Sequence, residues 1–195
     1  MLSPTVVSGN VIFSSGASLD YDEGFLNGIS SDIADDYLEL SGSGSLDIDN
    51  YAEVNITNAR SSSVLIKQSS LGNQGANKAK VMQEGNSNKA VIGQAGFNNT
   101  AYIRQEGNNN KALVGQIGSN SEALVLQSGD HNIAIVGQSS SMFTASKVSI
   151  NQTEDNNFAF VGGSGNANLG ISQNGGDIII IDASNSMKVY IDQTN

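Results

Sequence analysis

Apolar and polar residues alternate through the middle of the chain in a repeating unit of 11 residues. Six glutamines stand at successive intervals of 11, and each is preceded by an alanine at four residues and a branched aliphatic residue at two. A glycine follows two residues after five of the six glutamines, and an asparagine usually follows five residues after. The unit therefore reads N-x-A-x-(I/V)-x-Q-x-G-x-x.

This spacing predicts strands joined by tight turns. The marked residues of N-x-A-x-V-x-Q are two apart, so they share one face of a β-strand, whereas a helix would spread them around its circumference. Glycine tolerates positive φ, which suits the x-G-x-x segment to a turn. Two strands and two turns make a coil of 22 residues. Stacked coils place equivalent residues in columns spaced about 4.8 Å apart, with two parallel sheets facing each other.

Three sets of residues acquire roles in such a stack. The predicted core comprises Ala79, Val81, Ala90, Ile92, Ala101, Ile103, Ala112, Val114, Ala123, Val125, Ala134 and Val136. The predicted inward amide ladder comprises Gln83, Asn88, Gln94, Asn99, Gln105, Asn110, Gln116, Gln127, Asn132, Gln138, Gln152, Asn157, Gln173 and Gln193. The predicted turn glycines are Gly85, Gly96, Gly107, Gly118 and Gly129. Buried amides without partners cost about 1–3 kcal/mol each, and stacking in register lets each donate to the next.

The predicted fold class is an all-β solenoid of about seven two-stranded coils, a cross-β arrangement with an irregular acidic N-terminal segment. We divide the chain into that segment, at 1–35, degenerate coils at 36–76, regular repeats at 77–138 and degenerate repeats at 139–195. Leu38 and Leu40 are candidates for the first strand, followed by one at Leu46 and Ile48. About fifteen strands give a stack roughly 35 Å tall.

The N-terminal segment does not follow the repeat. Val6–Val7 and Val11–Phe13 are candidate strands, and Phe25, Ile29 and Ile33 have the spacing of a short helix. This segment is expected to be a leader, a cap or an address read by a secretion channel, and to lie outside the ordered stack. At the other end, the final strand at 188–193 is expected to be uncapped.

The outward-facing positions leave two interpretations open. The middle outward position is apolar or aromatic in each regular unit after the first: Val91, Tyr102, Leu113, Leu124 and Ile135. One interpretation is a solvated sheet with scattered hydrophobic residues. The other is lateral contact between filaments or with a surface.

Composition and charge narrow the function. The net charge is −10, and residues 1–60 carry ten acids against one base, which disfavours binding to nucleic acid. Low charge in the remainder, together with 24 Asn and 11 Gln, is typical of self-associating β segments. The sequence lacks cysteine and any long apolar run for a membrane helix. A signal peptide is also missing, so the chain is interpreted as a mature form.

The sequence contains no recognisable set of catalytic residues. The single histidine, His131, is expected in a solvated turn, and the serines and threonines have no base to activate them. Asp20, Asp22 and Glu23 lack the glycine-rich pattern of calcium-binding solenoids, and Gly162–Gly165 lacks the strand–loop–helix context of a phosphate loop. We therefore expect no enzyme activity, no catalytic or metal-ligating residues and no cofactor.

The segments 90–105, AVIGQAGFNNTAYIRQ, and 123–138, ALVLQSGDHNIAIVGQ, resemble curlin repeats. Curlins are the subunits of curli, the extracellular amyloid fibres of bacterial biofilms. The resemblance covers about residues 64–195 and rests on paired glutamines 11 residues apart. The sequence near residues 92–105 is most similar to that of the minor, nucleating curlin. The major curlin subunit is the alternative.

The resemblance implies a secreted structural subunit that polymerises at the bacterial cell surface and supports adhesion and the biofilm matrix. Its implied partners are other copies of itself, other curlin subunits, a curli secretion channel and accessory proteins. The open edges of a β-solenoid agree with growth by strand addition. The alternative is a monomeric β-solenoid acting as an adhesin or a carbohydrate-binding stalk, which would need caps at both ends.

Overall fold

The computed structural model describes residues 10–13, 31–42, 50–70 and 75–194. They form two stacked sheets and one helix, α2 (Ser31–Gly42). Sheet A contains β1 (Asn10–Phe13), β2 (Asn50–Thr57), β4 (Asn77–Glu84), β6 (Thr100–Glu106), β8 (Glu122–Ser128), β10 (Lys147–Thr153), β12 (Asn168–Asn174) and β14 (Lys188–Thr194). Sheet B contains β3 (Ser63–Ser70), β5 (Lys89–Phe97), β7 (Lys111–Ser119), β9 (Ile133–Ser139), β11 (Phe158–Ser164) and β13 (Ile178–Ala183).

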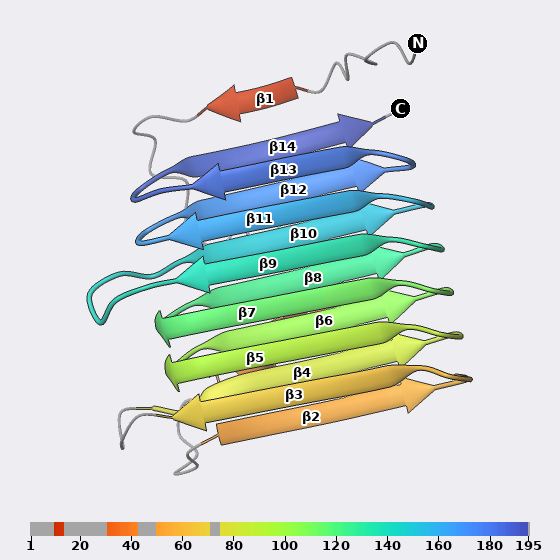
Figure 1. The fold of residues 1–195 in the computed structure, drawn as a ribbon, viewed down its shortest axis with the longest axis horizontal. Coiled ribbons are helices and arrows are strands. Elements are labelled where there is room, and N and C mark those ends of the chain that lie inside the picture. The colour runs from red at the N-terminus through yellow and green to blue at the C-terminus, as the bar shows by residue number, and fades with distance from the viewer. Residues whose placement is uncertain (1–9, 14–30, 43–49, 71–74, 195) are drawn as a thin grey trace.

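The chain from β2 to β14 winds as a β-solenoid, alternating between the sheets at every turn (Figure 1). All pairings between these strands are parallel, and successive coils match Gln83 to Gln105 to Gln127. The predicted fold class is thereby confirmed. The described residues give thirteen solenoid strands, which make six coils and a final half-coil, rather than fifteen strands in seven coils.

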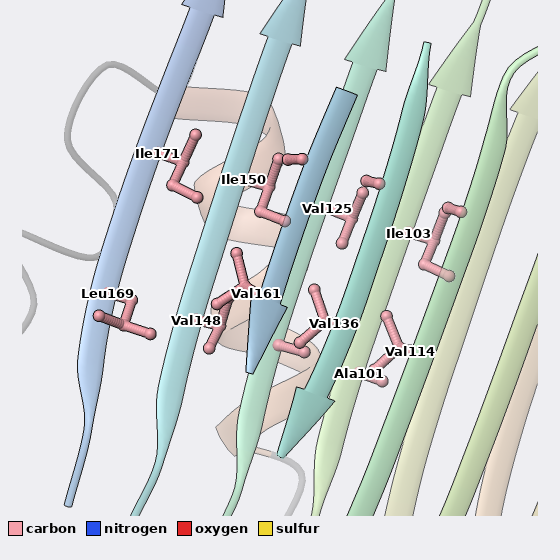
Figure 2. Close-up of a cluster of buried hydrophobic side chains, with 14 of the residues drawn as sticks. Ala101, Ile103, Val114, Val125, Val136, Val148, Ile150, Val161, Leu169 and Ile171 are labelled. Atoms are coloured by element: carbon pink, nitrogen blue, oxygen red, sulfur yellow. The ribbon is translucent and has the colours of Figure 1, made fainter. Parts of the chain in front are cut away.

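The core is a thin layer between the sheets. Figure 2 shows side chains such as Ile103 and Val125 from sheet A pointing toward Val114 and Val136 from sheet B. Every second residue of a strand contributes, because side chains alternate between the faces of a sheet. The small alanine beside each branched residue lets the two sheets approach closely, so the interior is filled by two apolar columns per sheet.

The glycine turns are required by the stacking of one coil on the next. Gly107 has a φ of +105°, and a Cβ built there would lie 2.2 Å from the carbonyl oxygen of Gly129 in the following coil. A non-glycine residue would therefore be strained by its own backbone and would also clash with its neighbour. The same close approach recurs at Gly85 and Gly96, which explains why glycine keeps the repeat phase.

The helix corrects one prediction. Leu38 and Leu40 were candidates for a first strand, but both lie in α2. Ile33, Tyr37 and Leu40 follow the i, i+4, i+7 spacing of a helix, and they pack together on the outer face of sheet A. The acids in the first turns favour the helix through its dipole, and the helix ends at Gly42.

The C-terminal strand is capped, contrary to expectation. β1 pairs antiparallel with β14, with Asn10 opposite Asp192 and Phe13 opposite Val189, at the end of the stack (Figure 1). The candidate strand at 11–13 is therefore confirmed, and this part of the N-terminal segment joins sheet A rather than lying outside it. The candidates Val6–Val7, Phe25, Ile29, Leu46 and Ile48 fall outside the described residues.

Candidate functional site

The candidate site is the pair of inner amide columns that run the length of the stack. In sheet A, Nε2 of Gln83 donates to Oε1 of Gln105 at 2.7 Å, and Nε2 of Gln105 donates to Oε1 of Gln127 at 2.8 Å. The column continues through Gln152 and Gln173 to Gln193, with the last bond at 3.4 Å. Each Nε2 from Gln105 to Gln173 also donates to a backbone carbonyl of the facing strand, as Gln105 does to Lys89. Both amide hydrogens are thus used, which removes the penalty for burying them.

Sheet B carries a shorter column with the same geometry. It runs from Gln68 through Gln94 and Gln116 to Gln138, with distances of 2.8–2.9 Å. Gln68 was not among the predicted ladder residues, although its spacing from Gln94 fits the phase if the longer turn at 71–76 is allowed. Beyond Gln138 the column stops, because Gly163 and Ala183 occupy the glutamine position of β11 and β13.

The two columns are therefore open at opposite ends. The sheet A column begins at Gln83, because Ile56 holds the glutamine position of β2, and it runs to the last strand. The sheet B column begins in its first strand and stops before its last two. All donors point toward the C-terminal end of the stack. Oε1 of Gln83 is buried and has no hydrogen-bond partner among the described residues, as expected for the first rung.

The asparagines are organised differently from the glutamines. Nδ2 of Asn110 donates to the backbone carbonyls of Glu106 and Gly129, at 3.1 and 2.7 Å, and its backbone N–H donates to Oδ1 of Asn88. The side chain therefore ties its own turn to the turn of the next coil. Direct amide-to-amide bonds occur at two of these positions, Asn99 to Asn77 and Asn157 to Asn132.

The structure brings the predicted residues together in columns and buries them. All fourteen predicted ladder residues are at most 7% exposed, and all twelve predicted core residues are at most 3% exposed. The five predicted turn glycines all have positive φ, between 98° and 119°. His131 lies in a turn, is exposed and has a φ of 63°. Asp20, Asp22 and Glu23 lie outside the described residues.

The helix α2 packs on the outer face of sheet A over β4, β6 and β8, an arrangement that the sequence did not predict. Tyr102 and Leu124 are fully buried beneath the helix, with the Tyr37 and Tyr102 rings edge-to-face at 6.5 Å. The Tyr37 hydroxyl donates to Glu122 at 2.6 Å. Burial, together with the nearby Asp36 carboxylate, raises the pKa of Tyr102 to about 12. Two of the outward apolar residues thus belong to an intramolecular contact.

The outer face of sheet B has a different character. Its exposed apolar residues include Leu65, Leu113 and Ile180, and no described element packs over them. Beside them runs a column of small residues, Gly93, Gly115, Gly137 and Gly162, that begins at Lys67 and ends at Asp182. The column forms the floor of a shallow groove.

The N-terminal end of the stack exposes part of the interior. At the N-terminal end, Val54 and Ile56 of β2 point along the core face yet are 47% and 43% exposed. At the C-terminal end, on the outward face of β14, Oδ1 of Asp192 is buried without a partner among the described residues. Within the part of the chain that the structure describes, no strand pairs with the outer edges of β2, β3 or β13. These edges offer unpaired backbone groups to another chain.

The model of the curlin associated repeat matches the chain at residues 76–107 and 98–125. The matched region spans β4 to β8, where the glutamine columns and glycine turns are most regular. The curlin-repeat resemblance is therefore confirmed for residues 76–125. Comparisons with curated proteins and with solved structures give no match. Among the described residues, no helix has the length and apolar character needed to cross a membrane.

Proposed function

We propose that the chain, which carries curlin associated repeats at residues 76–107 and 98–125, is a subunit of an extracellular curli-like fibre. The fibre grows by adding the edge strands of one copy to those of the next. The fibre supports adhesion and the biofilm matrix at the bacterial surface. Other curlin subunits, a secretion channel and accessory proteins are its proposed partners. Its use of the repeat is structural, without catalysis or a cofactor.

One observation carries this proposal: each inner glutamine column reaches one end of the stack, the sheet A column at β14 and the sheet B column at β3. A copy added to such an end gains backbone hydrogen bonds and another rung of the column together. The exposed Val54 and Ile56 add an apolar contribution, because an added coil removes them from water. A soluble protein that worked alone would have reason to cover such an end.

The nucleating role is the finer part of the proposal. A minor curlin starts fibres, and the repeat sequence near residues 92–105 favours assigning this chain to the minor type. Its regular middle coils form a pre-ordered template, whereas the irregular coils after 139 have no amide column in sheet B. Addition of small amounts of this chain to a major curlin should then shorten the lag before fibres appear.

A second candidate function, a monomeric stalk or adhesin, is favoured by one specific observation. β1 covers four residues of β14, as a cap on a monomeric solenoid would. The cap is partial, since it lies on sheet A and leaves the outer edge of β13 in sheet B unpaired among the described residues.

The deciding experiment is assembly of the purified chain at micromolar concentration, followed by electron microscopy and diffraction from aligned material. Fibres with reflections near 4.8 Å along the axis and about 10 Å across it are expected. Preformed fibres should remove the lag when added as seeds. A soluble monomer that persists for days, and that seeds do not convert, would establish the stalk in place of the fibre subunit.

A further inference from the structure

The described solenoid strands, β2 to β14, number thirteen, and this odd number constrains how two copies can join. Both end strands, β2 and β14, lie in sheet A, so sheet A has seven solenoid strands and sheet B has six. With β1 set aside, sheet A therefore projects one strand beyond sheet B at each end of the described stack. Each end of the stack therefore forms a step, in which the terminal strand of sheet A has no strand of sheet B facing it at the same level.

Two junctions are possible between such steps. If the copies keep the same orientation, β14 pairs with β2 of the next copy, and sheet B is left one strand short at the junction. If the next copy is rotated by half a turn about the stack axis, its β2 fits above β13 and its β3 pairs with β14. The rotation exchanges the sheets, whose strands run in opposite directions, so both new pairings are parallel and neither sheet has a gap.

The side chains of β14 and β3 match in the rotated junction. Continuing the observed register places Gln193 beside Gln68 of the next copy, so the sheet A column of one copy runs into the sheet B column of the next. The donors of both columns point the same way, and Nε2 of Gln193 faces the acceptor end of Gln68. The columns, open at opposite ends, are thus joined.

The outward residues of the same pair also match. Asp192 falls beside Lys67 of the next copy, and Tyr190 falls beside Leu65. Lys67 is exposed, and the buried Oδ1 of Asp192 has no partner among the described residues. Opposite charges on neighbouring strands stabilise a sheet, as do aromatic–aliphatic pairs.

The second pair of strands, β13 and β2 of the next copy, also match, because neither strand has a glutamine at the glutamine position. Ala183 and Ile56 hold the glutamine position on the two strands, so an apolar residue meets an apolar residue. In the unrotated junction, Ile56 would instead meet Gln193 and leave its amide without a continuation. Tyr190 would there face Glu53, and Asp192 would face Asn55, so both outward pairs would lose their match.

We propose that copies of this chain join head to tail with a half-turn between them, through β14 with β3 and β13 with β2. This inference rests on the proposed fibre function and specifies its interface. It also assigns a role to β1, which pairs with the four residues of β14 from Val189 to Asp192 that β3 of the next copy would use. The incoming copy must therefore displace β1 from this edge.

Site-directed cross-linking tests the junction, because the native chain has no cysteine. Filaments are grown from an equal mixture of Tyr190→Cys and Leu65→Cys chains and treated with a short bis-maleimide. Neighbouring side chains in a sheet lie about 5 Å apart, within its reach. Cross-linked dimers are expected in this mixture and are not expected from Tyr190→Cys mixed with Glu53→Cys. Each variant alone serves as the control for lateral contacts.

A charge exchange provides an independent measurement with intact filaments. Asp192→Lys and Lys67→Asp should each slow seeded growth by about two- to fivefold, and the double variant should recover the parent rate. The unmodified filament should repeat every two copies, so that α2 reappears on the same face at about 62 Å.

The outcomes separate the inference from the function it rests on. Filaments that cross-link Tyr190→Cys to Glu53→Cys, or that repeat at about 34 Å, would overturn the half-turn and leave the fibre function standing. Filaments in which neither mixture cross-links and the charge exchange shows no recovery would overturn the junction as well. Failure of the unmodified chain to form filaments would overturn both the junction and the fibre.

Discussion

Replacing Gln105 with glutamate tests the inner column at a fully buried rung. The Nε2 of Gln105 donates to Gln127 at 2.8 Å and to the carbonyl of Lys89 at 3.2 Å, and its Oε1 accepts from Gln83. An ionised carboxylate keeps the bond from Gln83 but places an acceptor against two acceptors. A protonated carboxyl group can donate to only one of them, and the other loses its partner.

The pH sets the size of the effect. Burial disfavours the charged form, so the pKa of the introduced carboxyl rises in the folded state above its unfolded value of about 4.3. The raised pKa means that stability is retained below about pH 4.3 and is lost as the pH increases. Folding in the protonated form at pH 7 costs about 4 kcal/mol, which sets an upper limit on the charge penalty. The lost bond adds about 1 kcal/mol at either pH.

We expect Gln105→Glu to assemble poorly at pH 7 and to recover most of its growth rate near pH 4. The assay compares seeded elongation rates and the protein left in solution at both pH values. Asn166→Asp is the matched control, because it makes the same change of amide to carboxylate at an exposed turn residue that only accepts a bond, from the backbone of Ala145. Growth of Gln105→Glu at the parent rate at pH 7 would refute the buried column.

Three further results are expected. Gly107→Ala should destabilise the fold by about 3 kcal/mol in denaturant unfolding, because φ is positive there, whereas Gly137→Ala, whose Cβ would meet open space, should change it little. Since the pKa of Tyr102 is raised to about 12, the contact with α2 should be retained below pH 10 and lost as the pH rises through 12, as measured by tyrosine absorbance and circular dichroism. Tyr102→Phe should remove this pH dependence, and the same pH profile in that variant would contradict the role of Tyr102. Deleting residues 1–13 should speed seeded growth by freeing the edge of β14, and equal rates with and without them would show that β1 does not compete.

The repeat phase was sufficient to predict the solenoid and its inward columns. An 11-residue period with alternation inside each unit leaves one arrangement that puts equivalent residues in register, and the turn glycines follow from the close approach of stacked turns. One predicted strand was wrong: Leu38 and Leu40 lie in α2, and because they are two residues apart they also fit a strand. Tyr37 distinguishes the helix, because with Ile33 and Leu40 it completes a helical face.

Two contacts could not be predicted from the sequence period: that of α2 with sheet A and that of β1 with β14. The outward apolar residues occur on both sheets at the same phase, so the pattern cannot indicate that α2 covers Tyr102 and Leu124 but leaves Leu113 exposed. The pairing of β1 with β14 joins segments at opposite ends of the chain through backbone bonds, and only four residues take part. Such a pairing is decided by which edge is unoccupied, a property of the completed fold.

In the proposed fibre, the position of α2 on the outside of the stack would limit how thick a bundle of fibres can become. Sheets that pack face to face approach to about 10 Å, whereas an intervening helix adds a layer roughly 10 Å thick. With a half-turn between copies, each side of a fibre alternates between a helix and a bare sheet, at intervals of about 31 Å. Two fibres can then meet closely only where bare stretches face each other, and the helices hold them apart elsewhere. Thin, separate fibres, with a regular set of exposed apolar patches for other partners, are the expected form of the material.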